Sequence, residues 1–292
     1  EPQTGAVKAW VGDIDFKSWK YDKVTAQRQP GSTFKLFVYT EAMNEGLTPC
    51  DKRRDEYISM QVYDKKKKEM TTWTPTNANG SFSGDSIPLK SAFAKSINSV
   101  AVRLGQELGI KNIIETAQKM GIESPLDDNP ALALGSSDVN LLELAGAYCT
   151  IANNGMHHRP TLVTRIVDSD GNEVFVDKST SEQVIPYKSA FFMQKLLMSG
   201  THDGGGTSVS LSAAEYAGNS FRDTDWGGKT GTTNNHSDAW FVGVSPNLVV
   251  GAWVGGEYRS IHFRTGALGQ GARTALPICG YFIHSVMEDP AF

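Results

Sequence analysis

Three short motifs contain residue types that together can transfer an acyl group through a serine. They are Ser32-Thr33-Phe34-Lys35, Ser96-Ile97-Asn98 and Lys229-Thr230-Gly231. If the first motif is helical, Ser32 and Lys35 are separated by about 60° around the axis and about 4.5 Å along it, so both side chains can reach one point. A neutral lysine amine can take the proton of a neighbouring hydroxyl and make it a nucleophile. The spacing therefore predicts Ser32 as the nucleophile and Lys35 as its base.

Lys35 can act as a base at neutral pH only if its pKa is lowered. An ordinary lysine, with a pKa near 10.4, is neutral about once in 2,500 molecules at pH 7, which would add about 4.6 kcal/mol to the barrier. Burial and a second nearby cation both lower the pKa of an amine. Lys229 is the candidate for that second cation.

Most of the specificity lies in the third motif and in the order of the three. At average residue usage, a chain of this length should contain roughly one Ser-x-x-Lys by chance but only about 0.07 Lys-Thr-Gly. Ser-x-Asn occurs again at Ser245-Pro246-Asn247, where a turn between two apolar runs is the simpler interpretation. If each motif stood alone, a helix cap would be the simpler interpretation of Ser32, Ser96 and Asn98.

Together the motifs resemble the transpeptidase domain of a bifunctional (class A) penicillin-binding protein. The resemblance extends over almost the whole chain. The segments that carry it are residues 5–12, 28–31, 73–84, 133–135, 152–155, 229–233, 238–241 and 251–255.

This resemblance implies a serine DD-transpeptidase that cross-links peptidoglycan stem peptides ending in D-Ala-D-Ala through an acyl-enzyme. β-Lactams would acylate the same serine. Ser96 would relay a proton to the leaving amine, and Asn98 would bind the substrate amide. The implied catalytic residues are Ser32, Lys35, Ser96, Asn98 and Lys229.

The resemblance also implies a substrate-binding strand that contains Thr230, Gly231, Thr232 and Thr233. An edge strand can pair with an extended peptide, and glycine allows the peptide to approach closely. The threonine hydroxyls beside Lys229 would bind the terminal carboxylate of the substrate. The backbone N–H groups of Ser32 and Thr232 would form the oxyanion hole.

Two other functions remain open at this point. A β-lactamase or DD-carboxypeptidase on the same fold would use water instead of an acceptor amine, and a non-catalytic β-lactam sensor would only become acylated. A fast hydrolase needs a carboxylate that activates water. The nearest lookalike of such a loop, residues 124–130, is interpreted as an ordinary connecting turn.

Composition and charge exclude some classes of binding partner. The chain has 292 residues, 39% of them hydrophobic, and a net charge of −4, so it can bury a large core but offers no basic field for nucleic acid. We expect no cofactor and no metal. No run reaches the roughly 18 apolar residues of a membrane span. The abrupt start suggests a piece of a larger protein whose missing N-terminal anchor would hold this domain on the extracytoplasmic side of the membrane.

The resemblance implies an α+β fold of the penicillin-binding-protein/β-lactamase type. The pattern of apolar residues predicts an antiparallel sheet built from both chain ends and packed against helices. We expect one domain over residues 1–292, with a sheet lobe at 1–30 and 156–292 and a helical lobe at 31–155. Expected strands are 5–12, 239–244 and 248–254, with a hairpin at 161–176. Expected helices follow Ser32 and cover 89–120 with a break at 96–98, 141–151, 190–198 and 274–287.

Overall fold

The computed structural model describes residues 1–292 except 16, 18–19, 65–66, 179, 213–223 and 290–292. Its central sheet has three antiparallel strands in the order β11-β10-β9. These are β9 (Gly227–Thr232), β10 (Asp238–Val244) and β11 (Val249–Gly255). Because both faces of the sheet are covered by helices, β10 is buried along its whole length and reads as an unbroken apolar run.

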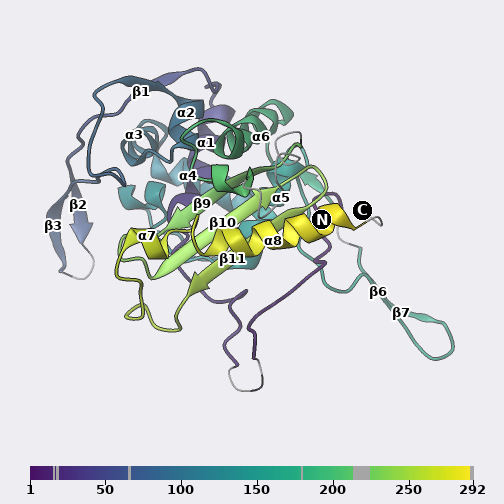
Figure 1. Ribbon diagram of the computed structural model, residues 1–292. Coiled ribbons are helices and arrows are strands. Elements are labelled where there is room, and N and C mark those ends of the chain that lie inside the picture. Colours follow the sequence, from purple (N-terminus) through teal and green to yellow (C-terminus); the bar gives the residue numbers. More distant parts are fainter. Residues whose placement is uncertain (16, 18–19, 65–66, 179, 213–223, 290–292) are drawn as a thin grey trace.

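Helix α8 (Ala275–Glu288) packs on β10 and β11 on one face of the sheet (Figure 1). Helices α5 (Leu141–Ala152) and α6 (Tyr187–His202) contact the sheet from the other side. Asn140 caps the first turn of α5 by accepting the N–H of Glu143. The sheet is therefore sandwiched between one C-terminal helix and a larger helical layer.

Helix α1 (Lys35–Asn44) runs through the middle of that helical layer. It follows the 3₁₀ turn η1 (Gly31–Phe34) and packs against α3 (Asn98–Leu108), α4 (Ile110–Lys119) and α6. Each of its residues from Lys35 to Met43 is buried. A helix that is apolar on nearly all sides belongs in a core, as the sequence predicts.

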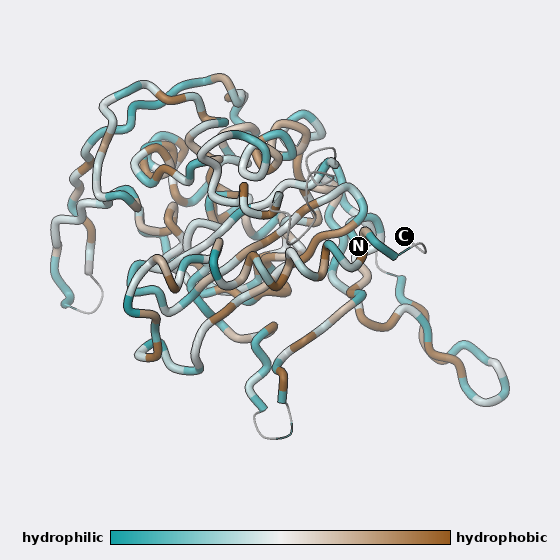
Figure 2. Tube along the Cα trace, viewed as in Figure 1, coloured by the Kyte–Doolittle hydropathy of each residue, from teal (hydrophilic) through white to brown (hydrophobic). Residues whose placement is uncertain are grey.

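The remaining elements lie around this body. Four short two-stranded sheets pair β1 (Lys52–Arg54) with β4 (Ser86–Pro88), β2 (Met60–Asp64) with β3 (Glu69–Trp73), β5 (Met156–His157) with β8 (Glu182–Gln183), and β6 (Arg165–Val167) with β7 (Glu173–Val176). The β6–β7 hairpin projects from the body, and its apolar side chains are exposed (Figures 1 and 2). Short helical segments are α2 (Leu89–Ala94), η2 (Pro130–Leu134), η3 (Val209–Ser212) and α7 (Gly266–Gly269).

The α+β class is confirmed, as are the expected helices, the hairpin and the two C-terminal strands. The expected strand at 5–12 is wrong. In the described part of the chain, this segment contributes only a parallel bridge between Ala6 and Thr161, so the central sheet comes from the last third of the sequence alone. Gly5 has φ +73°, which interrupts an extended chain at the start of the segment, and Val11 near its end is exposed. The proposed lobe boundaries stay a prediction.

Within the described ranges, no helix has both the length and the apolar character needed to cross a membrane.

Candidate active site

The first motif lies on a 3₁₀ turn that leads directly into α1. Residues three apart eclipse each other in 3₁₀ geometry, so Ser32 and Lys35 project on the same side of the chain. Ser32 is half-buried, whereas the side chain of Lys35 is fully buried. The turn starts at Gly31, whose φ of +54° favours glycine.

The amine of Lys35 is held by the second motif. Its Nζ donates to the backbone oxygen of Ser96 at 2.7 Å, to Ser96 Oγ at 3.1 Å and to Asn98 Oδ1 at 2.7 Å. Ser96 lies in the loop between α2 and α3 with a φ of +57°, a conformation that is strained for a residue with a side chain. Such strain is retained only where the surrounding contacts fix it.

Ser96 also receives the amine of the third motif. Lys229 Nζ donates to Ser96 Oγ at 2.9 Å and lies 5.7 Å from the centre of the Phe93 ring. One hydroxyl is thus shared by two lysines that are separated by almost two hundred residues in the sequence. The structure therefore brings Lys35, Ser96, Asn98 and Lys229 together, next to the turn that holds Ser32.

Both amines are buried among neutral partners, and this lowers their basicity. Burial, followed by the charge of Lys229, holds the pKa of Lys35 well below its ordinary value. Burial lowers the pKa of Lys229 to about 7. Lys35 can therefore be neutral at a pH where an exposed lysine is charged, which a general base requires.

Strand β9 is the edge strand of the central sheet and lies directly against η1. A Cβ on Gly231 would be 2.4 Å from the Pro30 carbonyl oxygen, and a Cβ on Gly31 would be 2.7 Å from the Thr232 oxygen. The Thr233 N–H donates to Asp238 of β10. Because successive N–H groups of a strand point in opposite directions, the Thr232 N–H points away from β10, toward the edge of the sheet.

The three threonines of this region have different environments. Thr230 Oγ1 donates to Thr207 Oγ1 at 2.7 Å, and Thr232 Oγ1 accepts the Gly271 N–H at 3.1 Å. Thr233 Oγ1 instead accepts the Asp238 N–H at 3.0 Å within the β9–β10 turn, although Thr230 and Thr233 are each 7% exposed. Thr230 and Thr232 remain candidates for contact with a ligand at the edge, whereas the hydroxyl of Thr233 is used in the turn.

Sequence reasoning missed Thr207. It follows Gly204-Gly205-Gly206, and its N–H donates to the Ala94 oxygen at the end of α2. A Cβ on Gly206 would be 2.5 Å from the Gly200 oxygen, so this glycine allows the loop to pack against α6. The position of the loop beside Lys-Thr-Gly has no local sequence signal.

A buried ion pair connects the segment before the first motif with the strand that follows the third motif. This pair was not identified from the sequence either. Arg28 Nε donates to Asp238 Oδ1 at 2.6 Å, and the guanidinium lies 5.0 Å from the centre of the Trp253 ring. Trp253 Nε1 donates to the same carboxylate oxygen at 3.1 Å. The resemblance covers these residues, but their pairing joins segments that are far apart in the sequence.

A third group of missed residues supports Asn98. The carboxamide of Asn77 and the carboxylate of Asp55 lie behind the second motif and contact the start of α3. From the sequence, Asn77 is noted only as part of segment 73–84, which carries the resemblance, and Asp55 has no expected role.

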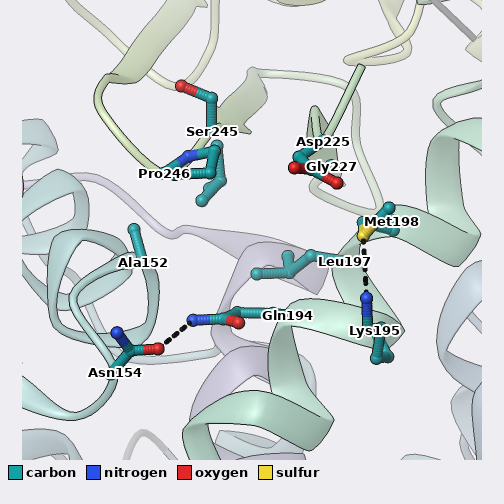
Figure 3. Close-up of a pocket in the computed structure, with 11 residues that line it drawn as sticks. Ala152, Asn154, Gln194, Lys195, Leu197, Met198, Asp225, Gly227, Ser245 and Pro246 are labelled. Carbon is teal, nitrogen blue, oxygen red and sulfur yellow. Dashed lines mark hydrogen bonds between the residues drawn. The ribbon is translucent and has the colours of Figure 1, made fainter. Parts of the chain in front are cut away.

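A separate pocket lies at the far end of β9 and contains none of the predicted catalytic residues. Its lining comes from α5, α6 and the β10–β11 turn, with Asn154, Gln194 and Ser245 among the polar groups (Figure 3). Ser245 belongs to the second Ser-x-Asn sequence. Its N–H and Oγ both bond to the Leu248 oxygen, which confirms the turn. In the described part of the chain, no group of His, Cys, Asp and Glu is arranged to hold a metal.

Comparisons with known proteins agree with this geometry. Residues 1–254 match the family model described as the penicillin binding protein transpeptidase domain. Penicillin-binding protein 2D of Bacillus subtilis (strain 168) is 34% identical over 264 residues, which cover 89% of this chain and 37% of that protein. Penicillin-binding protein 1A of Neisseria lactamica is 33% identical over 285 residues, which cover 95% of this chain and 34% of that protein. The chain thus spans about a third of the length of these relatives.

Solved structures show the same fold. Penicillin-binding protein 1A from Haemophilus influenzae gives a TM-score of 0.82 at 26% identity and covers 96% of this chain and 45% of that chain. PonA1 from Mycobacterium tuberculosis gives a TM-score of 0.81 at 23% identity over 99% of this chain and 74% of that chain, a likeness that concerns the fold alone. The resemblance noted from the sequence is confirmed: this chain belongs to the penicillin-binding protein transpeptidase domain family.

Proposed function

We propose that the chain is a single serine DD-transpeptidase domain that cross-links peptidoglycan stem peptides through an acyl-enzyme on Ser32. The observation that carries this proposal is the convergence of two buried lysines on the hydroxyl of Ser96, beside the turn that holds Ser32. This arrangement supplies a base of lowered pKa, a hydroxyl that can relay protons and a cation near an open strand edge. These are the groups that acyl transfer from a peptide with a terminal carboxylate needs.

In the proposed reaction, neutral Lys35 takes the Ser32 proton while Oγ bonds to the carbonyl carbon of the penultimate D-Ala. The N–H groups of Ser32 and Thr232 stabilise the oxyanion. The C–N bond then breaks as Ser96 passes its proton to the leaving D-Ala amine, and Ser96 takes in turn the proton that Lys35 received, so that Lys35 is neutral again. An acceptor amine on a second stem peptide attacks the ester, returns its proton through the same groups and frees Ser32.

The open edge of β9 would bind the donor peptide as an added strand. Asn98 Nδ2 would donate to the substrate amide, and Lys229 with Thr230 and Thr232 would bind its carboxylate. Gly231 and Thr233 would act through the backbone and the turn. β-Lactams, which the names of the curated relatives indicate as ligands of those proteins, would acylate Ser32 in place of the peptide. We further propose that the domain functions outside the cytoplasmic membrane as part of a longer, membrane-anchored protein.

Covalent labelling tests the assignment. A fluorescent penicillin should label the wild-type domain at one site, and Ser32→Ala should abolish labelling while leaving the thermal transition nearly unchanged. Ser245→Ala is the matched control because Ser245 lies in the other Ser-x-Asn sequence, and it should label at the wild-type rate. Labelling that persists in Ser32→Ala would show that another residue is the nucleophile.

The lifetime of the penicilloyl adduct and its transfer to an acceptor distinguish a transpeptidase from a hydrolase and from a sensor. Near the lookalike loop, Glu143 accepts from Ser124 Oγ at 2.7 Å and from Asn140 Nδ2 at 2.7 Å, so this carboxylate is engaged in structure. We therefore expect the penicilloyl adduct to last for many minutes to hours by intact mass. Turnover of a chromogenic cephalosporin above about 1 s⁻¹ would favour a hydrolase. A sensor would label but would not transfer the acyl group of a thioester donor to a D-amino acid.

A further inference from the structure

The start of helix α3 is capped by a residue from outside the helix. Asn77 Oδ1 accepts the N–H of Asn98 at 2.9 Å and that of Ser99 at 3.2 Å. The residue at the N-cap position itself, Ile97, has no side-chain acceptor for these groups. Two of the N–H groups that every helix leaves unpaired at its start are therefore satisfied from a loop twenty residues earlier in the sequence.

Asn77 is in turn held by a buried carboxylate. Asp55 is only 4% exposed, and its Oδ1 accepts from Asn77 Nδ2 at 2.7 Å and from Ser99 Oγ at 2.6 Å. Its Oδ2 accepts the Ser83 N–H at 2.9 Å. Because both oxygens are engaged, the carboxylate fixes the Asn77 side chain with its Oδ1 toward the helix.

The same loop fixes the orientation of the Asn98 carboxamide. Asn98 Nδ2 donates to the Thr76 backbone oxygen at 2.8 Å, and Asn98 Oδ1 accepts from Lys35 Nζ at 2.7 Å. A flipped carboxamide would place an oxygen against the Thr76 oxygen and an NH₂ group against the lysine, which would lose both bonds. The carbonyl of Asn98 is therefore directed at Lys35.

This orientation has a consequence for the amine. A neutral lysine has two N–H groups and one lone pair. The two carbonyl oxygens that contact Nζ, from Ser96 and Asn98, can only accept, so they take the two N–H groups. The lone pair is then left for the hydroxyl side, where Ser96 Oγ lies at 3.1 Å.

We propose that Asp55 and Asn77 are positioning residues for acylation, which hold the Asn98 carbonyl on Lys35 so that the lone pair of the neutral amine points toward the serine hydroxyls. The inference rests on the proposed function, because it concerns the step in which the Ser32 proton moves to Lys35 as Oγ bonds to the acyl carbon. Neither residue needs to touch the substrate.

The test measures saturable acylation by a penicillin, in which the first-order rate constant k2 is separated from the dissociation constant Kd. Rates are expressed per active site, as titrated by the final adduct. Asn77→Ala should lower k2 at least about tenfold and change Kd much less, because small displacements of a catalytic group slow chemistry strongly. The control is Asn79→Ala, which removes an exposed asparagine from the same loop and should keep the wild-type k2.

Asn77→Ser is a second variant, which tests the same proposal if Asn77→Ala does not fold. A serine hydroxyl can donate and accept, but it lies one bond closer to the backbone than the polar atoms of asparagine and cannot reach Asp55 and the start of α3 as the carboxamide does, so k2 should again fall. A purely structural role would lower the fraction of active protein and leave k2 unchanged, which would overturn the inference. If the wild-type protein is not acylated at all, the proposed function fails instead.

Discussion

At the scale of single residues, the feature that matters most is the sharing of Ser96 Oγ by Lys35 and Lys229. The sequence predicts both lysines and the need for a lowered pKa, since these follow from residue types and from burial. It does not predict the φ of +57° at Ser96 or the use of Thr233 within a turn. Those depend on contacts between segments that only the folded chain brings together.

The lowered pKa of Lys229 gives a prediction about pH. Lys229 is charged below its pKa of about 7 and neutral above it, so its attraction for a carboxylate should weaken as the pH rises. The second-order rate constant for acylation by a penicillin should therefore fall above about pH 7, because this constant reports the free enzyme. A penicillin methyl ester, which lacks the anion, should not show that fall. If the rate constants for the penicillin and its methyl ester fell equally above pH 7, Lys229 would not bind the carboxylate.

At the scale of elements, the site depends on the contact between β9 and η1. Local pattern predicts many elements well. The helix expected at 141–151 agrees with α5 (Leu141–Ala152) to within one residue. The local pattern does not predict which segments pair as strands, because the apolar pattern of residues 5–12 is the same with or without a neighbouring strand. The network of Asp55 and Asn77 was missed for the same reason, since it joins segments far from α3 in the sequence.

Gly231→Ala tests that contact. The new methyl group would lie 2.4 Å from the Pro30 oxygen and 3.0 Å from Thr33 Cγ2, so β9 must move away from the turn that holds Ser32. We expect acylation to slow at least about tenfold, since displacement of the strand would move the Thr232 N–H away from the position proposed for the oxyanion. Gly204→Ala is the control, because nothing lies within 4 Å of its Cβ. Normal acylation by Gly231→Ala would mean that the strand tolerates displacement.

At the scale of the whole molecule, the Arg28–Asp238 pair joins the segment before the nucleophile to the sheet. The exposed fractions of the two side chains are 5% and 0%. Removal of one partner from a buried pair leaves the other charge uncompensated and typically costs about 3–5 kcal/mol. Arg28→Ala should therefore lower the free energy of unfolding in urea by about that amount.

The matched control is Arg259→Ala. Arg259 bonds to both oxygens of Asp138, but the two side chains are 43% and 39% exposed, and such surface pairs contribute about 0–1 kcal/mol. If Arg28→Ala costs no more than Arg259→Ala, the buried pair does not hold the two segments together.

The full burial of α1 has a consequence for how the protein can open. Lys35 begins a helix whose residues are buried through Met43, and its amine is held by a loop that packs on the same core. Parts of a protein with few buried contacts, such as the projecting β6–β7 hairpin, can unfold locally at low free energy. Lys35 cannot be released in that way. We therefore expect the free energy required to expose the Lys35 amine to be close to the free energy of unfolding the entire domain.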